Sequence, residues 1–298
     1  MLVLFLSATT LVGGQSPVQV PDGFPSLGQP PRFTVLSQGA NPRTALRFVV
    51  PGGYRGRLNL DLARIDSAGV LGWARQTDLP FFRIGVDLTI QRVVGDELVY
   101  RFAFGGAEMH EPGSEPRIVG ELRNVTDSSV GVVTISNRGF VRAAIVEATD
   151  LLSLPLPFHV ATLVHQYLLC AFPEEAIGVG ARWEVREAVD WGGAMVFQKS
   201  ECAATAVAAD SVTLTMRFDQ TVPPQPVWSP FAGDVVEDSI TAAGFGRVTV
   251  PLNSLVPTGE ITTRTVTVRS SMRRGAAGPP RVFTTVSTDK VFVSPGRN

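Results

Sequence analysis

The chain has 298 residues, which is enough for one large domain or two ordinary ones with a sizeable buried core. Its 26 Lys and Arg and 27 Asp and Glu leave a formal net charge of -1. Without the basic runs that phosphate backbones require, it has no features of a nucleic-acid-binding protein. Only 18% of the residues are charged, and 29 are Gly and 22 are Pro. This composition favours strands and turns over helices.

The N-terminus begins with an apolar run that ends in small residues, MLVLFLSATTLVGG. The run is too short to cross a bilayer, which takes about 20 residues. We therefore expect a signal peptide over residues 1–14, with cleavage after Gly14, although no Lys or Arg precedes the run and the true start would then lie upstream. A buried N-terminal strand is the alternative. Export to the periplasm, the cell surface or the medium is expected, with no transmembrane segment.

A Pro- and Gly-rich stretch over residues 15–45 predicts an extended lead-in. A single β-rich domain is expected from residue 46 to residue 298. Its segments 86–94 and 97–104 alternate apolar and polar residues around Gly95-Asp96, which predicts a hairpin with a two-residue turn. Further strands are predicted from the same alternation at 54–63, 130–136, 140–148, 183–189, 194–207, 212–220, 246–252, 261–272 and 281–294.

One segment has a different period. In 157-PFHVATLVHQYLLCAF-172 the polar residues His159, Thr162, His165 and Gln166 fall on one narrow stripe at helical spacing. Pro157 suits a first helical turn and Pro173 ends the run. The segment predicts one central helix with a wide apolar face.

About ten or eleven strands and one helix predict a mainly β fold. We expect a strongly curved antiparallel sheet, a half-barrel or open barrel, wrapped on the helix near 157–172. A sandwich of two sheets is the alternative. The Pro-rich segment 221–231 is expected to form a loop between strands, as a rim or lid.

Four segments carry a resemblance to a known family: 38-QGANPRTALRFVVPGG-53, 136-SNRGFV-141, 172-FPEEAIGVGARWEV-185 and 244-GFGRVTVPLNSLVPTGEITTRTVTV-268. The most specific pattern consists of Pro173, Glu174, Ile177, Gly178, Gly180 and Trp183. Together the segments resemble a family of exported bacterial proteins with a domain of unknown function, common in myxobacteria and their relatives. The resemblance implies export, a β-rich domain and a central helix, but no activity. Its layout is similar to that of periplasmic lipoprotein carriers, although this sequence lacks the lipobox cysteine that members of the family often carry.

The connector 173–182 also has a physical interpretation that is independent of the family. Gly178 and Gly180 permit positive φ and a close approach of backbones, so that the chain turns sharply into a strand. Trp183 is expected to anchor the start of that strand in the core.

No catalytic constellation, metal site or cofactor site is predicted. The sequence has no Gly-x-Ser-x-Gly elbow, and His110, His159 and His165 have no recognisable ligand spacing with the two cysteines. In an exported chain Cys170 and Cys202 can form a disulfide, and two buried free thiols are the equal alternative.

The remaining candidate site is the apolar interior. We predict that a lipid or other apolar ligand binds on the concave side of the sheet, in a protein that is not an enzyme. A packed core without a cavity is the alternative, in which case the protein is an envelope scaffold or binds a protein partner through its outer surface. A hydrolase assembled from distant segments is the third hypothesis. The residues predicted to line the ligand site are Phe102, Phe104, Leu163, Tyr167, Met195, Phe197, Met216 and Phe218.

Overall fold

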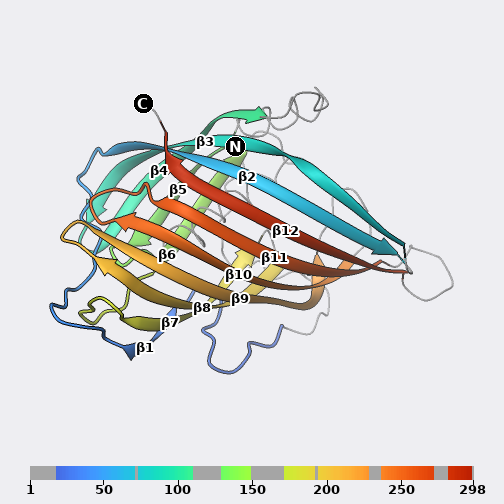
Figure 1. The fold of residues 1–298 in the computed structure, drawn as a ribbon, viewed down its shortest axis with the longest axis horizontal. Helices are drawn as coiled ribbons and strands as arrows, with labels where there is room; N and C mark the ends of the chain where they lie inside the picture. The colour runs from blue at the N-terminus through green and yellow to red at the C-terminus, as the bar shows by residue number, and fades with distance from the viewer. Residues whose placement is uncertain are drawn as a thin grey trace.

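The computed structural model describes residues 18–70, 73–109, 129–148, 171–191, 194–227, 236–271 and 281–296. These residues form twelve strands in one antiparallel sheet (Figure 1). The strands are β1 (Arg32–Ser37), β2 (Arg55–Val70), β3 (Trp73–Val94), β4 (Glu97–Met109), β5 (Ser129–Ser136), β6 (Val141–Ala148), β7 (Arg182–Trp191), β8 (Ala194–Val207), β9 (Ser211–Val227), β10 (Val236–Pro251), β11 (Thr258–Ser271) and β12 (Arg281–Pro295).

The sheet is open. Its strand order is β1-β7-β8-β9-β10-β11-β12-β2-β3-β4-β5-β6, so that β1 and β6 are the two edges. The sheet curves strongly, and β4, β5 and β6 lie behind β9–β12 in the view of Figure 1. The predicted mainly β fold with one curved antiparallel sheet is confirmed, and the sandwich alternative is wrong. Part of the higher strand count comes from β1, which alternates Phe33 and Val35 with polar residues inside the predicted lead-in.

The predicted central helix is not supported. No helix occurs among the residues that the structure describes. Residues 157–170 lie outside those residues, and the last two residues of the predicted helix, Ala171 and Phe172, have no helical structure. Within the described ranges, no helix is long and apolar enough to cross a membrane.

The predicted hairpin over residues 86–104 is confirmed, and the predicted strands 130–136 and 140–148 also pair as a hairpin. Val94 pairs with Glu97 across Gly95-Asp96, and Gly95 has a φ of 59°. The apolar rows of β3 and β4 are buried, with Val86 at 1% exposure and Tyr100 at 1%. These rows pack in a core that β2–β5 and β7–β12 share. The second hairpin joins β5 to β6.

Residues 221–227 of the Pro-rich segment belong to strand β9 and do not form the predicted loop, and residues 228–231 lie outside the described residues. The register of β9 with β10 shifts, because Val222 pairs with Ile240 and Gln225 pairs with Asp238. Pro223 and Pro224 therefore lie opposite a single residue, in a bulge where their missing N–H groups break no regular ladder. The side chain of Gln225 replaces the lost pairing with β8: its Oε1 accepts from the N–H of Met195 at 2.9 Å, and its Nε2 donates to the same residue's carbonyl at 3.0 Å.

We expect Gln225→Ala to lower the free energy of unfolding by about 2 kcal/mol, because the variant leaves the partly buried backbone N–H and carbonyl of Met195 without their partners. Urea unfolding followed by circular dichroism measures the change. The control is Gln91→Ala, which removes an exposed amide from β3 and should change the free energy of unfolding by less than about 0.5 kcal/mol. A Gln225→Ala variant as stable as the unaltered protein would mean that the side chain does not bridge the strands.

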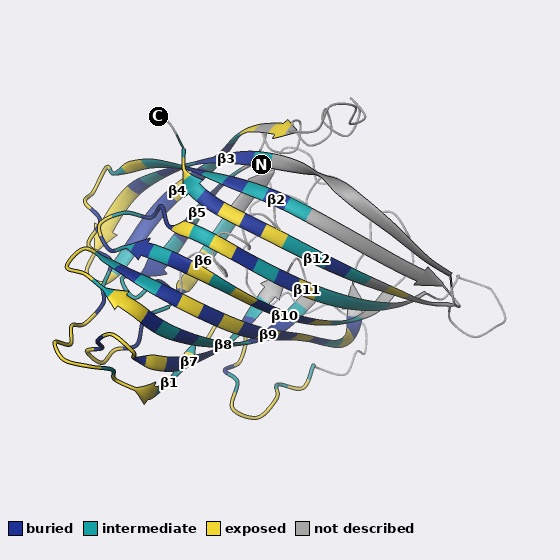
Figure 2. Cartoon of the chain, viewed as in Figure 1, coloured by how far each residue is buried: buried dark blue, intermediate teal, exposed yellow. Residues whose placement is uncertain are grey.

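The main core lies at one end of the sheet, where loops cover it (Figure 2). Segment 38–50 binds segment 172–181 by backbone hydrogen bonds, among them Ala40 N–H to the Val179 carbonyl at 2.8 Å and Thr44 N–H to the Ile177 carbonyl at 3.0 Å. Leu46 and Ile177, one from each segment, are fully buried in the main core. We call the two segments together the end loops.

The expectations for the connector are confirmed. Gly180 has a φ of 82°, which is in the left-handed region. At Gly178 a Cβ would lie 1.9 Å from the carbonyl oxygen of Ala40, so glycine is required by the close approach of the end loops. Trp183 is fully buried at the start of β7, and its indole Nε1 donates to the Ala171 carbonyl at 2.9 Å.

Candidate functional site

Cross-strand register places the inner-face residues of β7–β12 in rows that run across the sheet. A row near the end loops is apolar and closely packed: apart from Gly246, which has no side chain, each member is at most 5% exposed. Its members, in strand order, are Trp183, Cys202, Met216, Gly246, Ile261 and Val291. The inner face near the end loops is therefore a solid core.

The predicted ligand-binding residues do not all lie on this face. Phe102, Phe104, Met216 and Phe218 do, and all four are buried in the main core. Because β8 has no register shift before Ala204, Met195 and Phe197 point to the opposite face from Gln198 and Cys202. Leu163 and Tyr167 lie outside the described residues.

On the outer face, Phe197 is covered by the lead-in. Its ring packs edge-on against Phe24 at 5.4 Å, and the guanidinium of Arg186 lies 5.8 Å from the centre of the Phe24 ring. Phe197 is thus buried by the lead-in, and Met195 and Phe197, which were predicted to line the ligand site, lie on the face opposite the concave side.

Farther from the end loops, the inner face becomes polar. One row across β7–β12 consists of Glu187, Gln198, Gln220, Ala242, Thr265 and Ser287, and the row before it contains Ser200, Thr263 and Asp289. We call these residues, without Ala242, the polar belt. Beyond it the face is apolar again, in a small cluster of Val189, Val196, Val222 and Ile240.

Side-chain hydrogen bonds join the members of the belt on β7, β8 and β9. Gln198 is 2% exposed, and its Nε2 donates to Oε1 of Glu187 at 3.1 Å and to Oγ of Ser200 at 3.0 Å. Its Oε1 accepts from Nε2 of Gln220 at 2.6 Å. Both protons of the Gln198 amide are therefore used within the belt.

Glu187 is the acid of this network. Burial raises its pKa to about 7, because the surrounding protein disfavours the charged carboxylate. The side chain nevertheless keeps part of its surface accessible, as do Thr265 and Asp289 of the belt and Val189 and Ile240 beyond it. The inner face is therefore closely packed near the end loops and less closely packed from the belt outward.

Of the two cysteines, the structure describes Cys202. Cys202 is a buried free thiol beside Trp183 on the inner face. Cys170 lies outside the described residues, but the next residue, Ala171, accepts the hydrogen bond of the Trp183 indole. This contact brings the chain next to Cys170 close to Cys202, and the disulfide stays a prediction.

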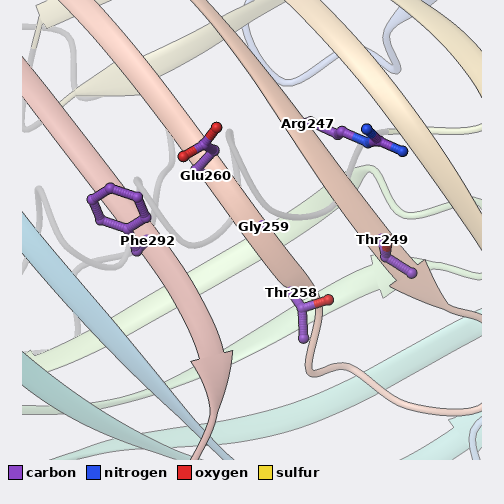
Figure 3. A pocket seen from close by; sticks show the side chains of 6 residues that line it. All are labelled: Arg247, Thr249, Thr258, Gly259, Glu260 and Phe292. Carbon is purple, nitrogen blue, oxygen red and sulfur yellow. The ribbon is translucent and has the colours of Figure 1, made fainter.

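A shallow depression of about 360 Å³ lies on the outer face of β10, β11 and β12 (Figure 3). The side chains of Arg247, Glu260 and Phe292 project from three adjacent strands around it, and Thr249, Thr258 and Gly259 complete the lining. Phe292 is 39% exposed, and Phe245 nearby on β10 is 65% exposed.

Among the described residues, no group of three or more His, Cys, Asp or Glu side chains is arranged to hold a metal ion. A comparison with models of protein families and with curated proteins finds no match to this chain.

The polar belt was missed at the level of sequence, although a signal for it exists. Glu187 stands in phase with Trp183, Val185 and Val189, and Gln220 stands in phase with Phe218 and Val222. A polar residue on the apolar phase of a strand is a buried polar residue, which requires a hydrogen-bonding partner.

Proposed function

We propose that this is a non-enzymatic exported protein that binds a lipid or similar amphipathic molecule on the concave side of its sheet. The observation that carries the proposal is the partial accessibility of Glu187, Thr265, Val189 and Ile240 on an inner face that is otherwise closely packed. A polar belt beside an apolar cluster provides both kinds of surface that an amphipathic molecule needs. Export rests on the N-terminal sequence, which lies outside the described residues.

The neutral dye Nile red tests the binding, because its fluorescence rises when it leaves water for an apolar site. We expect saturable binding that dodecanol displaces, and we expect Thr265→Trp to weaken it about tenfold or more by filling the accessible space. The control Arg264→Trp places the same ring on the outer face of β11 and should have no effect. Far-UV circular dichroism checks that both variants fold, and Val189→Trp tests the same space from β7.

Equal binding by the Thr265→Trp, Val189→Trp and Arg264→Trp variants would overturn the concave-side proposal. It would favour the second candidate, a scaffold or interaction protein that works through its outer face. The feature behind that alternative is the depression beside Phe292, with Phe245 exposed next to it.

A further inference from the structure

Glu187 has no counter-ion on the inner face of its own strand or of the two strands that follow it in the sheet. Its neighbours there are Val185 and Val189 on β7, and the inner-face residues of β8 and β9 are likewise uncharged. The other acid among the described inner-face side chains is Asp289, which is on β12 at the far side of the belt.

The cations of β7 and β8 lie on the outer face, and acids of that face bind them. Arg186 and Lys199 both pair with Glu184, at 2.6 Å and 2.8 Å, and Arg182 pairs with Glu201. The protein therefore neutralises Glu184 and Glu201 on the outer face, whereas Glu187 on the inner face receives a single amide donor from Gln198.

At Glu187 the belt also has more hydrogen-bond acceptors than donors. Oε1 of Glu187 accepts from Gln198, and within the described part of the chain no hydrogen bond reaches its Oε2. Both amide protons of Gln198 are already donated, to Glu187 and to Ser200. The carboxylate of Glu187 is therefore available to a ligand as a hydrogen-bond acceptor, and it is negatively charged when ionised. A donor with a positive charge complements it best.

We propose that the molecule bound on the concave side carries a cationic amine, which Glu187 binds, and an apolar chain that lies against Val189, Val196, Val222 and Ile240. This inference rests on the proposed function and specifies its ligand class: an amphiphile with an ammonium head. An ammonium beside the carboxylate favours its ionised form. Because burial holds the pKa of Glu187 at about 7, binding of the amine should strengthen as the pH rises from 6 to 8.

Three twelve-carbon probes, used below their micellar concentrations, test the head group by displacement of Nile red at pH 8: dodecylammonium, dodecanol and dodecanoate. Alkylamines stay protonated at this pH, as a lysine side chain does. We expect dodecylammonium to bind about tenfold tighter than dodecanol or better, as a charge-assisted hydrogen bond predicts, and dodecanoate to bind most weakly. The preference for the amine should shrink several-fold at pH 6.

Glu187→Gln should abolish the preference for dodecylammonium over dodecanol. The control Asp219→Asn removes an exposed acid from the outer face of β9 and should keep the preference. Equal binding of amine and alcohol by the unaltered protein, or an amine preference that survives Glu187→Gln, overturns the inference and leaves the proposed function standing. Failure of all three probes to bind overturns the proposed function itself. The pH profile of the unaltered protein tests the same group without any substitution.

Discussion

Gly178→Ala is expected to lower the free energy of unfolding by about 3 kcal/mol or more. The added methyl group would lie 1.9 Å from the carbonyl oxygen of Ala40 and 2.9 Å from that of Pro42, so that backbone would have to move. Movement there would break the hydrogen bonds between the two end loops, among them Gly178 N–H to the Gln38 carbonyl at 2.9 Å. Leu46 and Ile177, the side chains that the end loops bury in the core, would become exposed to solvent.

Two other glycines separate this effect from general consequences of adding a methyl group. Gly180 has a φ of 82°, but an added methyl group there would meet no atom within 4 Å, so Gly180→Ala should cost about 1 kcal/mol from backbone strain alone. Gly52 has open space and no positive φ, so Gly52→Ala should change stability by less than about 0.5 kcal/mol. Urea unfolding measures all three variants. If Gly178→Ala and Gly52→Ala have the same free energy of unfolding, the end loops do not pack as described.

Local periodicity was sufficient to predict most of the fold. The alternation of Val86, Leu88 and Ile90 with polar residues has one explanation, a half-buried strand, and the Gly95-Asp96 turn sets its pairing with β4. Sequence patterns failed where contacts between strands override the conformational preference of the local residues. Pro223 and Pro224 are turn residues by propensity, but a bulge and the side chain of Gln225 keep them in β9.

The candidate site was harder to predict, because the pairing register of the strands decides to which face of the sheet each side chain points. Phe197 and Phe218 are equally apolar in sequence, and only the pairing of β8 with β9 shows that they point to opposite faces. A search for periodic apolar residues also overlooks the polar residues of the inner face. Glu187, Gln198 and Gln220 come from three strands, and they form a network only when the register brings them into one row.

Glu187→Gln is expected to stabilise the protein at pH 8 and to have little effect near pH 4. An unfolded glutamate has a pKa of about 4.3, and burial raises the folded value to about 7. The folded state therefore keeps a proton that the unfolded chain releases, so the contribution of Glu187 to stability falls as the pH rises from about 4 through 7. At pH 8 the ionised carboxylate costs on the order of 3–4 kcal/mol, and the glutamine, which still accepts the hydrogen bond of Gln198, removes that cost.

The difference in unfolding free energy between the variant and the unaltered protein, measured in urea at pH 4.5, 6 and 8, isolates this group from the other acids. Glu184 on the outer face of β7 provides the matched control with the opposite sign. Burial by itself would raise the pKa of Glu184, but hydrogen bonds and charge from Lys199 and Arg186 outweigh burial and lower it. Its stabilising contribution is therefore present at pH 8 and is lost as the pH falls below about 4, so Glu184→Gln should destabilise at pH 8. Two variants with pH profiles of the same sign would mean that Glu187 is not enclosed by the protein, and the belt would then be an exposed surface.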